Sequence, residues 1–94
     1  MTADTCVSAA SHVSIKAVDE RAVLVDLNTG QTWELNEVAF AVWRMLTDGA
    51  SVGKTAEAIS VRYAVTPDVS QRDVLDLVQL LADQKLVVLR TAGR

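Results

Sequence analysis

The chain has 94 residues, half of them hydrophobic and 22% charged, which is enough for one domain with a single hydrophobic core. Its 12 acidic and 9 basic residues give a net charge of −3. This balance argues against a nucleic-acid partner, because phosphate binding needs clustered Lys and Arg. No segment approaches the roughly 20 consecutive apolar residues that a membrane-spanning helix needs.

Residues 1–11 are rich in Ser, Thr and Ala and show no periodic pattern, which predicts a flexible tail. This segment holds Cys6, the single cysteine, so no intrachain disulfide can form, and such cysteine usage fits a reducing cytoplasm. The segment also lacks the basic start and the apolar stretch of a secretory signal peptide. We therefore expect a cytoplasmic protein.

The next part of the chain predicts three strands. Residues 12–18 and 21–27 alternate apolar and polar side chains, with the period of two that is typical of a half-buried strand. An Asn-Thr-Gly turn then leads to a third strand, QTWEL at 31–35, which places Trp33 and Leu35 on one face. We expect an antiparallel sheet whose strands follow the order of the sequence.

Three helices are predicted to follow these strands. The first runs from residue 37 to about 47 and is capped by Asn36. The second lies between residue 51, which can cap it, and about residue 64. The third starts after the capping hydroxyl of Thr66 and runs from 67 to about 84, with proline at its first position.

The remaining segments complete the predicted architecture. The apolar run at 86–89 fits either a last helical turn or a small strand, and residues 90–94 are predicted to be a tail. Three strands followed by three helices predict an α+β fold with the parts of a winged helix-turn-helix. We expect this fold to occupy residues 12–89 as one domain.

The third predicted helix carries more apolar surface than one contact with the core requires. On a helical wheel its apolar side chains cover an arc of roughly 220°, against little more than about 100° for an ordinary surface helix. Either the other two helices cover this arc from both sides, or one flank of it lines a groove. The residues of the arc are Val74, Leu75, Leu77, Val78, Leu80, Leu81 and Ala82.

The third predicted strand is the second unusual feature, because it lies at an edge of the sheet with one row of backbone N–H and C=O groups unpaired. Proteins usually protect such an edge with Pro, Lys or a covering segment. The stretch 31–35 has neither Pro nor Lys, and Glu34 is its only charge. An open edge beside an apolar helix flank suits the capture of an extended peptide by strand addition.

Residue types needed for other functions are scarce in this chain. Cys6 and His12 alone do not make a metal-ligand set or a catalytic constellation, so we expect no enzyme activity, metal or cofactor. DNA binding fits the fold class but not the third helix, which carries acidic residues such as Asp73 and Asp76 with Arg72 as its basic residue. A small winged-helix regulator is kept as an alternative.

The ordered combination of these segments resembles the PqqD-like domains known as RiPP recognition elements. Among them, the chain is most similar to the discrete leader-binding proteins of lasso-peptide biosynthesis. The resemblance covers residues 12 to about 89. Its features are the VLVDLNTG hairpin, the WELNEVA strand-to-helix junction, the DGAS break, the RYAVTPDV junction and the apolar third helix that ends in LV.

The resemblance implies a non-enzymatic adaptor that binds the leader region of a ribosomally made precursor peptide. In the lasso branch it implies presentation to a transglutaminase-like leader protease and a lasso cyclase; in the alternative, cofactor branch, to a radical SAM enzyme. The leader would pair as an added strand with the third strand and pack against one flank of the third helix. The resemblance does not determine which flank this is. The implied peptide-binding residues are Gln31, Thr32, Trp33, Glu34, Leu35, Asp73, Val74, Asp76, Leu77, Val78 and Leu81.

Overall fold

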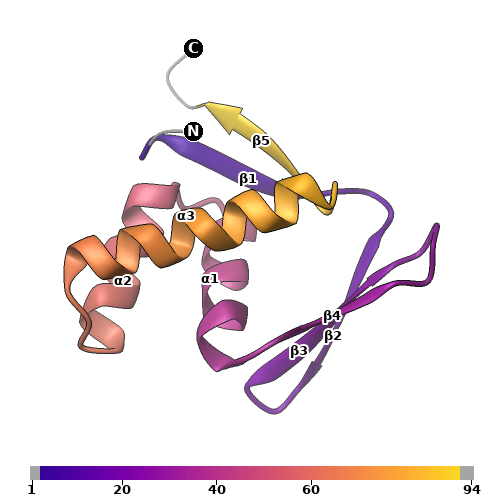
Figure 1. Ribbon diagram of the computed structural model, residues 1–94, viewed down its shortest axis with the longest axis horizontal. Helices are drawn as coiled ribbons and strands as arrows, with labels where there is room; N and C mark the ends of the chain where they lie inside the picture. The colour runs from indigo at the N-terminus through magenta and orange to yellow at the C-terminus, as the bar shows by residue number, and fades with distance from the viewer. Residues whose placement is uncertain (1–2, 92–94) are drawn as a thin grey trace.

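The computed structural model of the protein describes residues 3–91 and has two small antiparallel sheets with three helices between them (Figure 1). No helix in this range is long and apolar enough to cross a membrane. The elements are β1 (Thr5–Ala9), β2 (Val13–Val18), β3 (Arg21–Asp26), β4 (Thr32–Leu35), α1 (Glu37–Thr47), α2 (Val52–Arg62), α3 (Pro67–Asp83) and β5 (Val87–Thr91).

The three strands predicted from the sequence form one sheet in the order β2-β3-β4, and three helices follow it. The predicted α+β class is therefore confirmed. In the register of β3 with β4, Ala22 lies opposite Leu35 and Leu24 lies opposite Trp33. Ala22, Leu24 and Leu35 are buried against the helices and Trp33 is half-buried, so these residues share the core face of the sheet.

Local capping signals set the starts of all three helices. The side chain of Asn36 accepts a hydrogen bond from the Ala39 N–H at 2.9 Å at the start of α1. The Ser51 side chain accepts from the Lys54 N–H at the start of α2, and the Thr66 side chain accepts from the Val69 N–H at the start of α3. Each cap satisfies a backbone N–H that has no partner inside its helix, which is why the predicted starts agree with the structure.

The cap of α3 makes a testable contribution to stability. Thr66→Ala is expected to lower the free energy of unfolding by about 1 kcal/mol, because the Val69 N–H loses its 3.3 Å acceptor. Thr66→Ser keeps a hydroxyl at this position and is expected to stay close to the parent. Urea denaturation measures both variants. Equal stability of Thr66→Ala and the parent would exclude a role for this cap.

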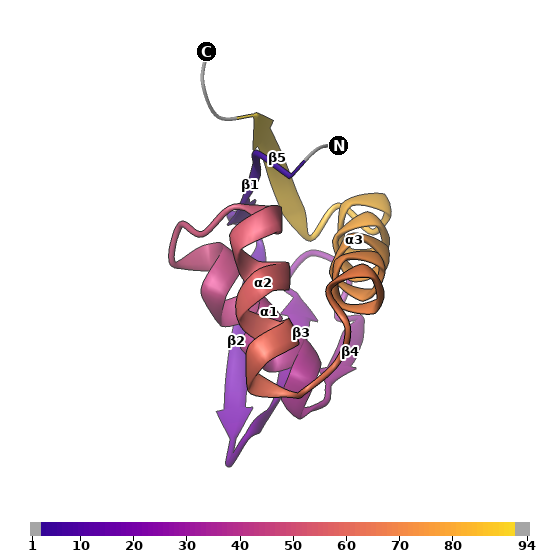
Figure 2. The same ribbon diagram turned by 90° about the vertical axis from the view of Figure 1, so that its left-hand side faces the viewer.

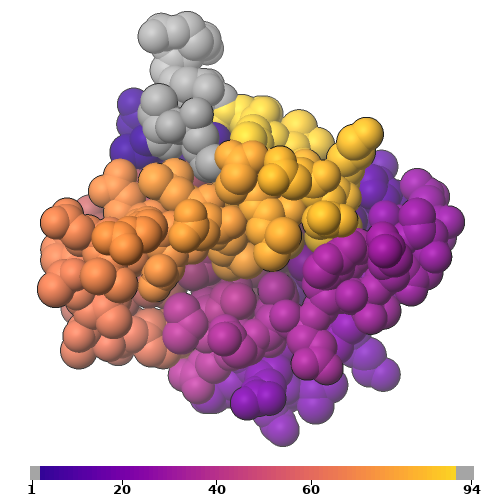
Figure 3. Space-filling model, viewed as in Figure 1, coloured from indigo at the N-terminus to yellow at the C-terminus, as the bar shows by residue number. Residues whose placement is uncertain are grey.

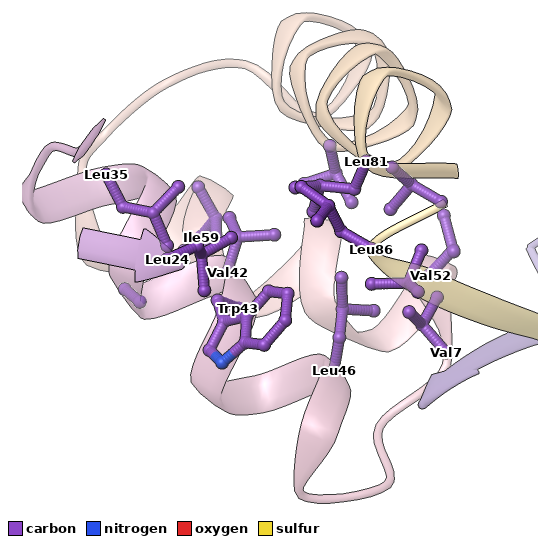
Figure 4. Close-up of a cluster of buried hydrophobic side chains, with 14 of the residues drawn as sticks. Val7, Leu24, Leu35, Val42, Trp43, Leu46, Val52, Ile59, Leu81 and Leu86 are labelled. Atoms are coloured by element: carbon purple, nitrogen blue, oxygen red, sulfur yellow. The ribbon is translucent and has the colours of Figure 1, made fainter. Parts of the chain in front are cut away.

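The core joins both sheets and all three helices (Figure 4). Helix α3 packs along α2, and the buried Ser70 hydroxyl donates to the Ala56 carbonyl at 2.5 Å between them. This bond satisfies a polar group at the centre of the helix pair. The largest fully buried hydrophobic side chains are Leu24, Leu46, Leu81, Leu86, Val52, Val74 and Val78.

The N-terminal segment corrects the predicted tail at 1–11. Residues 5–9 form β1, which pairs antiparallel with β5, and this ribbon lies away from the three-stranded sheet (Figure 2). Thr5 and Val7 alternate with less buried residues and face the core, which explains why the segment is ordered as a strand. Small polar residues at alternate positions hid this period in the sequence.

The C-terminal part resolves the alternative left open for residues 86–89. This run enters a strand and not a last helical turn, and the strand continues to Thr91, so part of the predicted tail at 90–94 is β-structure. Val87 is buried opposite Ala9 of β1. Residues 1–2 and 92–94, also predicted as tail, lie outside the described residues.

Candidate peptide-binding groove

Strand β4 pairs with β3 on one side and forms the predicted edge of its sheet. The Asp26 N–H donates to the Gln31 carbonyl at 2.9 Å, which fixes the phase of hydrogen bonding between the strands. Because antiparallel strands alternate bonded and non-bonded pairs, Trp33 directs its backbone groups to β3. Thr32 and Glu34 direct theirs to the open edge.

A cavity of about 360 Å³ lies just beyond the end of β4, between α1, α2 and α3. In Figure 3 the surface is hollowed between α3 and the part of the molecule formed by α1 and β4. We call this cavity, together with the inward side chains Trp33 and Leu35, the groove. The cavity is lined by Asn36, Val38, Ala39, Val42, Ile59, Tyr63, Val65, Asp73, Val74 and Leu77.

The structure separates the predicted residues of α3 into two groups. Val74, Val78 and Leu81 are buried at 2% exposure or less and serve the core, although Val74 also reaches the cavity wall. Leu77 is partly buried and lines the cavity together with the exposed Asp73. The flank that carries Asp73 and Leu77 is therefore the one that faces the groove.

One further residue of this flank was not among the predicted site residues. Leu80 is 50% exposed and lies one turn beyond Leu77, and residues three apart share one side of a helix. Asp76 is exposed at the margin of the same flank. An apolar side chain left half-exposed beside the groove extends its apolar wall along α3.

The cavity walls from α1 and α2 were also missed by sequence reasoning. Val38 lies in the first turn of α1 and is 37% exposed, whereas Ile59 is a buried residue of α2. Tyr63 lies at the end of α2, where its hydroxyl donates to the Glu37 carboxylate at 3.5 Å. No pattern along the chain joins these residues, because only the packing of three helices brings them to one cavity.

Acidic side chains lie around the groove. Glu34, Asp73 and Asp76 are exposed carboxylates, whereas the cavity lining and β4 contain no Lys or Arg. No cluster of three or more potential metal-ligating side chains occurs within residues 3–91. The groove therefore combines apolar walls, an open main-chain edge and an acidic rim, an arrangement that suits the addition of an extended peptide as a strand.

A peptide-binding winged-helix-like domain is the class that this fold and groove define. The family model of coenzyme PQQ synthesis protein D (PqqD) matches residues 21–87, so the chain belongs to the PqqD family. No curated protein sequence matches the chain. The predicted resemblance to PqqD-like RiPP recognition elements is confirmed by this match and by two similar solved structures.

Both similar structures were solved with a leader peptide. TbiB1 in complex with the TbiA(beta) leader peptide is 28% identical, with a TM-score of 0.80 over 85% of this chain and 93% of that chain. Lasso peptide synthetase B1 complexed with the leader peptide is 27% identical, with a TM-score of 0.82 over 87% of this chain and 96% of that chain. The fold of this chain is thus shared almost completely with these proteins.

Proposed function

We propose that this chain is a non-catalytic adaptor that binds the leader region of a ribosomally synthesised precursor peptide. The observation that carries the proposal is the open edge of β4 beside the apolar groove. Strand addition needs both features, since main-chain bonds supply affinity and pockets for alternate side chains supply specificity. The leader peptides in the two similar structures support the same class of ligand.

The register of β4 defines how a leader would bind. The backbone of the leader pairs with the outward N–H and C=O groups of Thr32 and Glu34. Every second side chain of the leader points inward beside Trp33 and Leu35. The inward side chain nearest to Leu35 enters the cavity at the end of β4. Gln31 precedes the strand, and its carbonyl is already bonded to β3, so its proposed contribution is its exposed side chain.

The helix side of the proposed site follows from burial. Leu77 contacts the inward side chains of the leader, and Asp73 and Asp76 form the rim. Val78 and Leu81 are buried in the core and do not contact the leader. They affect binding only by holding α3 in position. Recognition is thereby separated from chemistry, since the leader is held at the edge while the rest of the precursor extends away.

We propose that the bound leader is delivered in the cytoplasm to a transglutaminase-like protease and a lasso cyclase. The similarity to lasso peptide synthetase B1 favours these recipients. The family match favours a second candidate, delivery to a radical SAM enzyme. DNA binding is disfavoured, because the exposed groove flank of α3 carries Asp73 and Asp76 and would repel phosphates.

Titration with a fluorescent leader peptide tests the proposed function. The leader encoded next to this chain's gene is expected to bind saturably, while a scrambled leader of the same composition is not. A duplex DNA titration at low salt serves as the second arm, and no binding is expected there. A folded protein that binds neither its leader nor any leader of a neighbouring precursor would contradict the proposal.

A further inference from the structure

An exposed carboxylate lies where an added strand must pass. Thr32 and Glu34 direct their backbone groups to the open edge of β4, so a strand that pairs there has one residue opposite Glu34. Directly opposite side chains lie on one face of a sheet with Cβ atoms about 4.5–5.5 Å apart. The residue opposite Glu34 therefore lies within reach of its carboxylate.

The sheet itself does not neutralise Glu34. Its direct cross-strand neighbour is Val23, and Lys16 lies one strand further away, opposite Val23 on β2. Arg21 is a diagonal neighbour on β3, but no ion pair within 4 Å involves Glu34 in the part of the chain that the structure describes. Arg21 lines one cavity together with Glu34 but does not reach ion-pair distance, so the carboxylate is open to a cation of the peptide.

Acidic side chains also lie on the other side of the groove. Asp73 and Asp76 are exposed on the flank of α3 that faces the groove, and Asp73 lines the cavity. Arg62 stacks on Tyr63, with its guanidinium 5.4 Å from the ring centroid, but belongs to a different cavity. A surface lined by one sign of charge raises the local concentration of the opposite sign, which favours a basic ligand segment.

We propose that Glu34 selects leaders with Lys or Arg at the residue opposite it, adjacent in sequence to an apolar residue that points into the groove. This inference rests on the proposed function and adds the charge and position of a specificity contact. The cation faces solvent together with Glu34, because Trp33 and Leu35 occupy the other face of β4.

A charge-reversal cycle tests the proposal with the fluorescein-labelled leader encoded beside this chain's gene. Glu34→Lys is expected to weaken binding about three- to tenfold at low salt, since an attractive cross-strand pair becomes repulsive. Changing the opposing leader Lys or Arg to Glu is expected to do the same, and combining both changes restores affinity to within about twofold. Higher salt reduces each effect.

Glu57→Lys is the matched control, because Glu57 is an exposed acid of α2 that lines cavities away from the groove. It changes the net charge equally and is expected to change affinity by less than about twofold. Rescue at a single leader position, seen with Glu34→Lys and not with Glu57→Lys, supports the proposal. The same rescue with both variants would mean that net charge, and not the pairing position, governs binding.

The outcomes also separate this inference from the proposed function. Charge selection at Glu34 is overturned in two cases. Either Glu34→Lys binds the leader as tightly as the parent does, or no Lys→Glu or Arg→Glu change in the leader restores the affinity of Glu34→Lys. Strand addition still stands in that case if a main-chain block at the edge, Thr32→Pro, lowers leader affinity about tenfold or more. If the unmodified protein does not bind the leader at all, the proposed function and the inference fail together.

Discussion

Leu77→Asp is expected to weaken leader binding at least about tenfold while the protein stays folded. Leu77 is only partly buried and lines the cavity, so the unbound protein leaves a carboxylate there in contact with water. A bound leader would cover this carboxylate without a hydrogen-bonding partner, which costs more than the roughly 1–3 kcal/mol of a neutral polar group. Fluorescence anisotropy with the labelled leader measures the resulting change in Kd.

Two further variants decide how this result is interpreted. Val61→Asp adds the same charge at an 82% exposed valine of α2, outside the groove, and is expected to bind as the parent does. Leu81→Asp is unsuitable as a groove test, because Leu81 is 2% exposed and a buried carboxylate would unfold the domain. A folded Leu77→Asp protein with the parental Kd would exclude this flank of α3 as the binding wall.

The helices and the three-stranded sheet were predictable because their signals are local. Asn36, Ser51 and Thr66 each accept a bond from a backbone N–H three residues ahead, so a short sequence window contains the whole cap. The edge position of β4 was also predictable, since consecutive strands joined by tight turns must pair in order.

The ribbon of β1 and β5 was not predictable in this way. Its two strands are separated by nearly the whole chain, and neither has a strong alternating pattern alone. Val7 and Val87 become buried only when both strands meet the helices. Pairing between distant segments depends on tertiary structure. A short sequence window contains only one of the two strands, and that strand alone is just a polar or an apolar run.

The candidate site shows the same division between local and tertiary information. The apolar arc of α3 was visible on a helical wheel, but its division into core and groove depends on where α1 and α2 lie. Val74, Val78 and Leu81 are buried in the core, and Leu77 lines the cavity. The β4 residues of the proposed site follow from the strand register. The α3 residues of the site can be identified only from the packing of the three helices.

Thr32→Pro is expected to lower leader affinity about tenfold or more without unfolding the sheet. Thr32 is the first residue of β4 and directs its N–H to the open edge, so proline breaks no bond to β3. The leader carbonyl that this N–H would meet is left unsatisfied on binding, which costs about 1–3 kcal/mol. Thr32→Val keeps the N–H and the shape of the side chain, and is expected to bind normally.

Trp33→Pro provides the opposite expectation one residue further along β4. The N–H of Trp33 points toward Leu24 of β3, so proline there removes a bond of the sheet itself and is expected to lower stability. Thermal unfolding followed by circular dichroism separates this variant from Thr32→Pro, which should retain the parental transition. Trp33→Pro also removes a half-buried side chain that packs against the core, which adds to the loss of stability. Normal leader binding by a folded Thr32→Pro protein would mean that the leader does not pair with this edge.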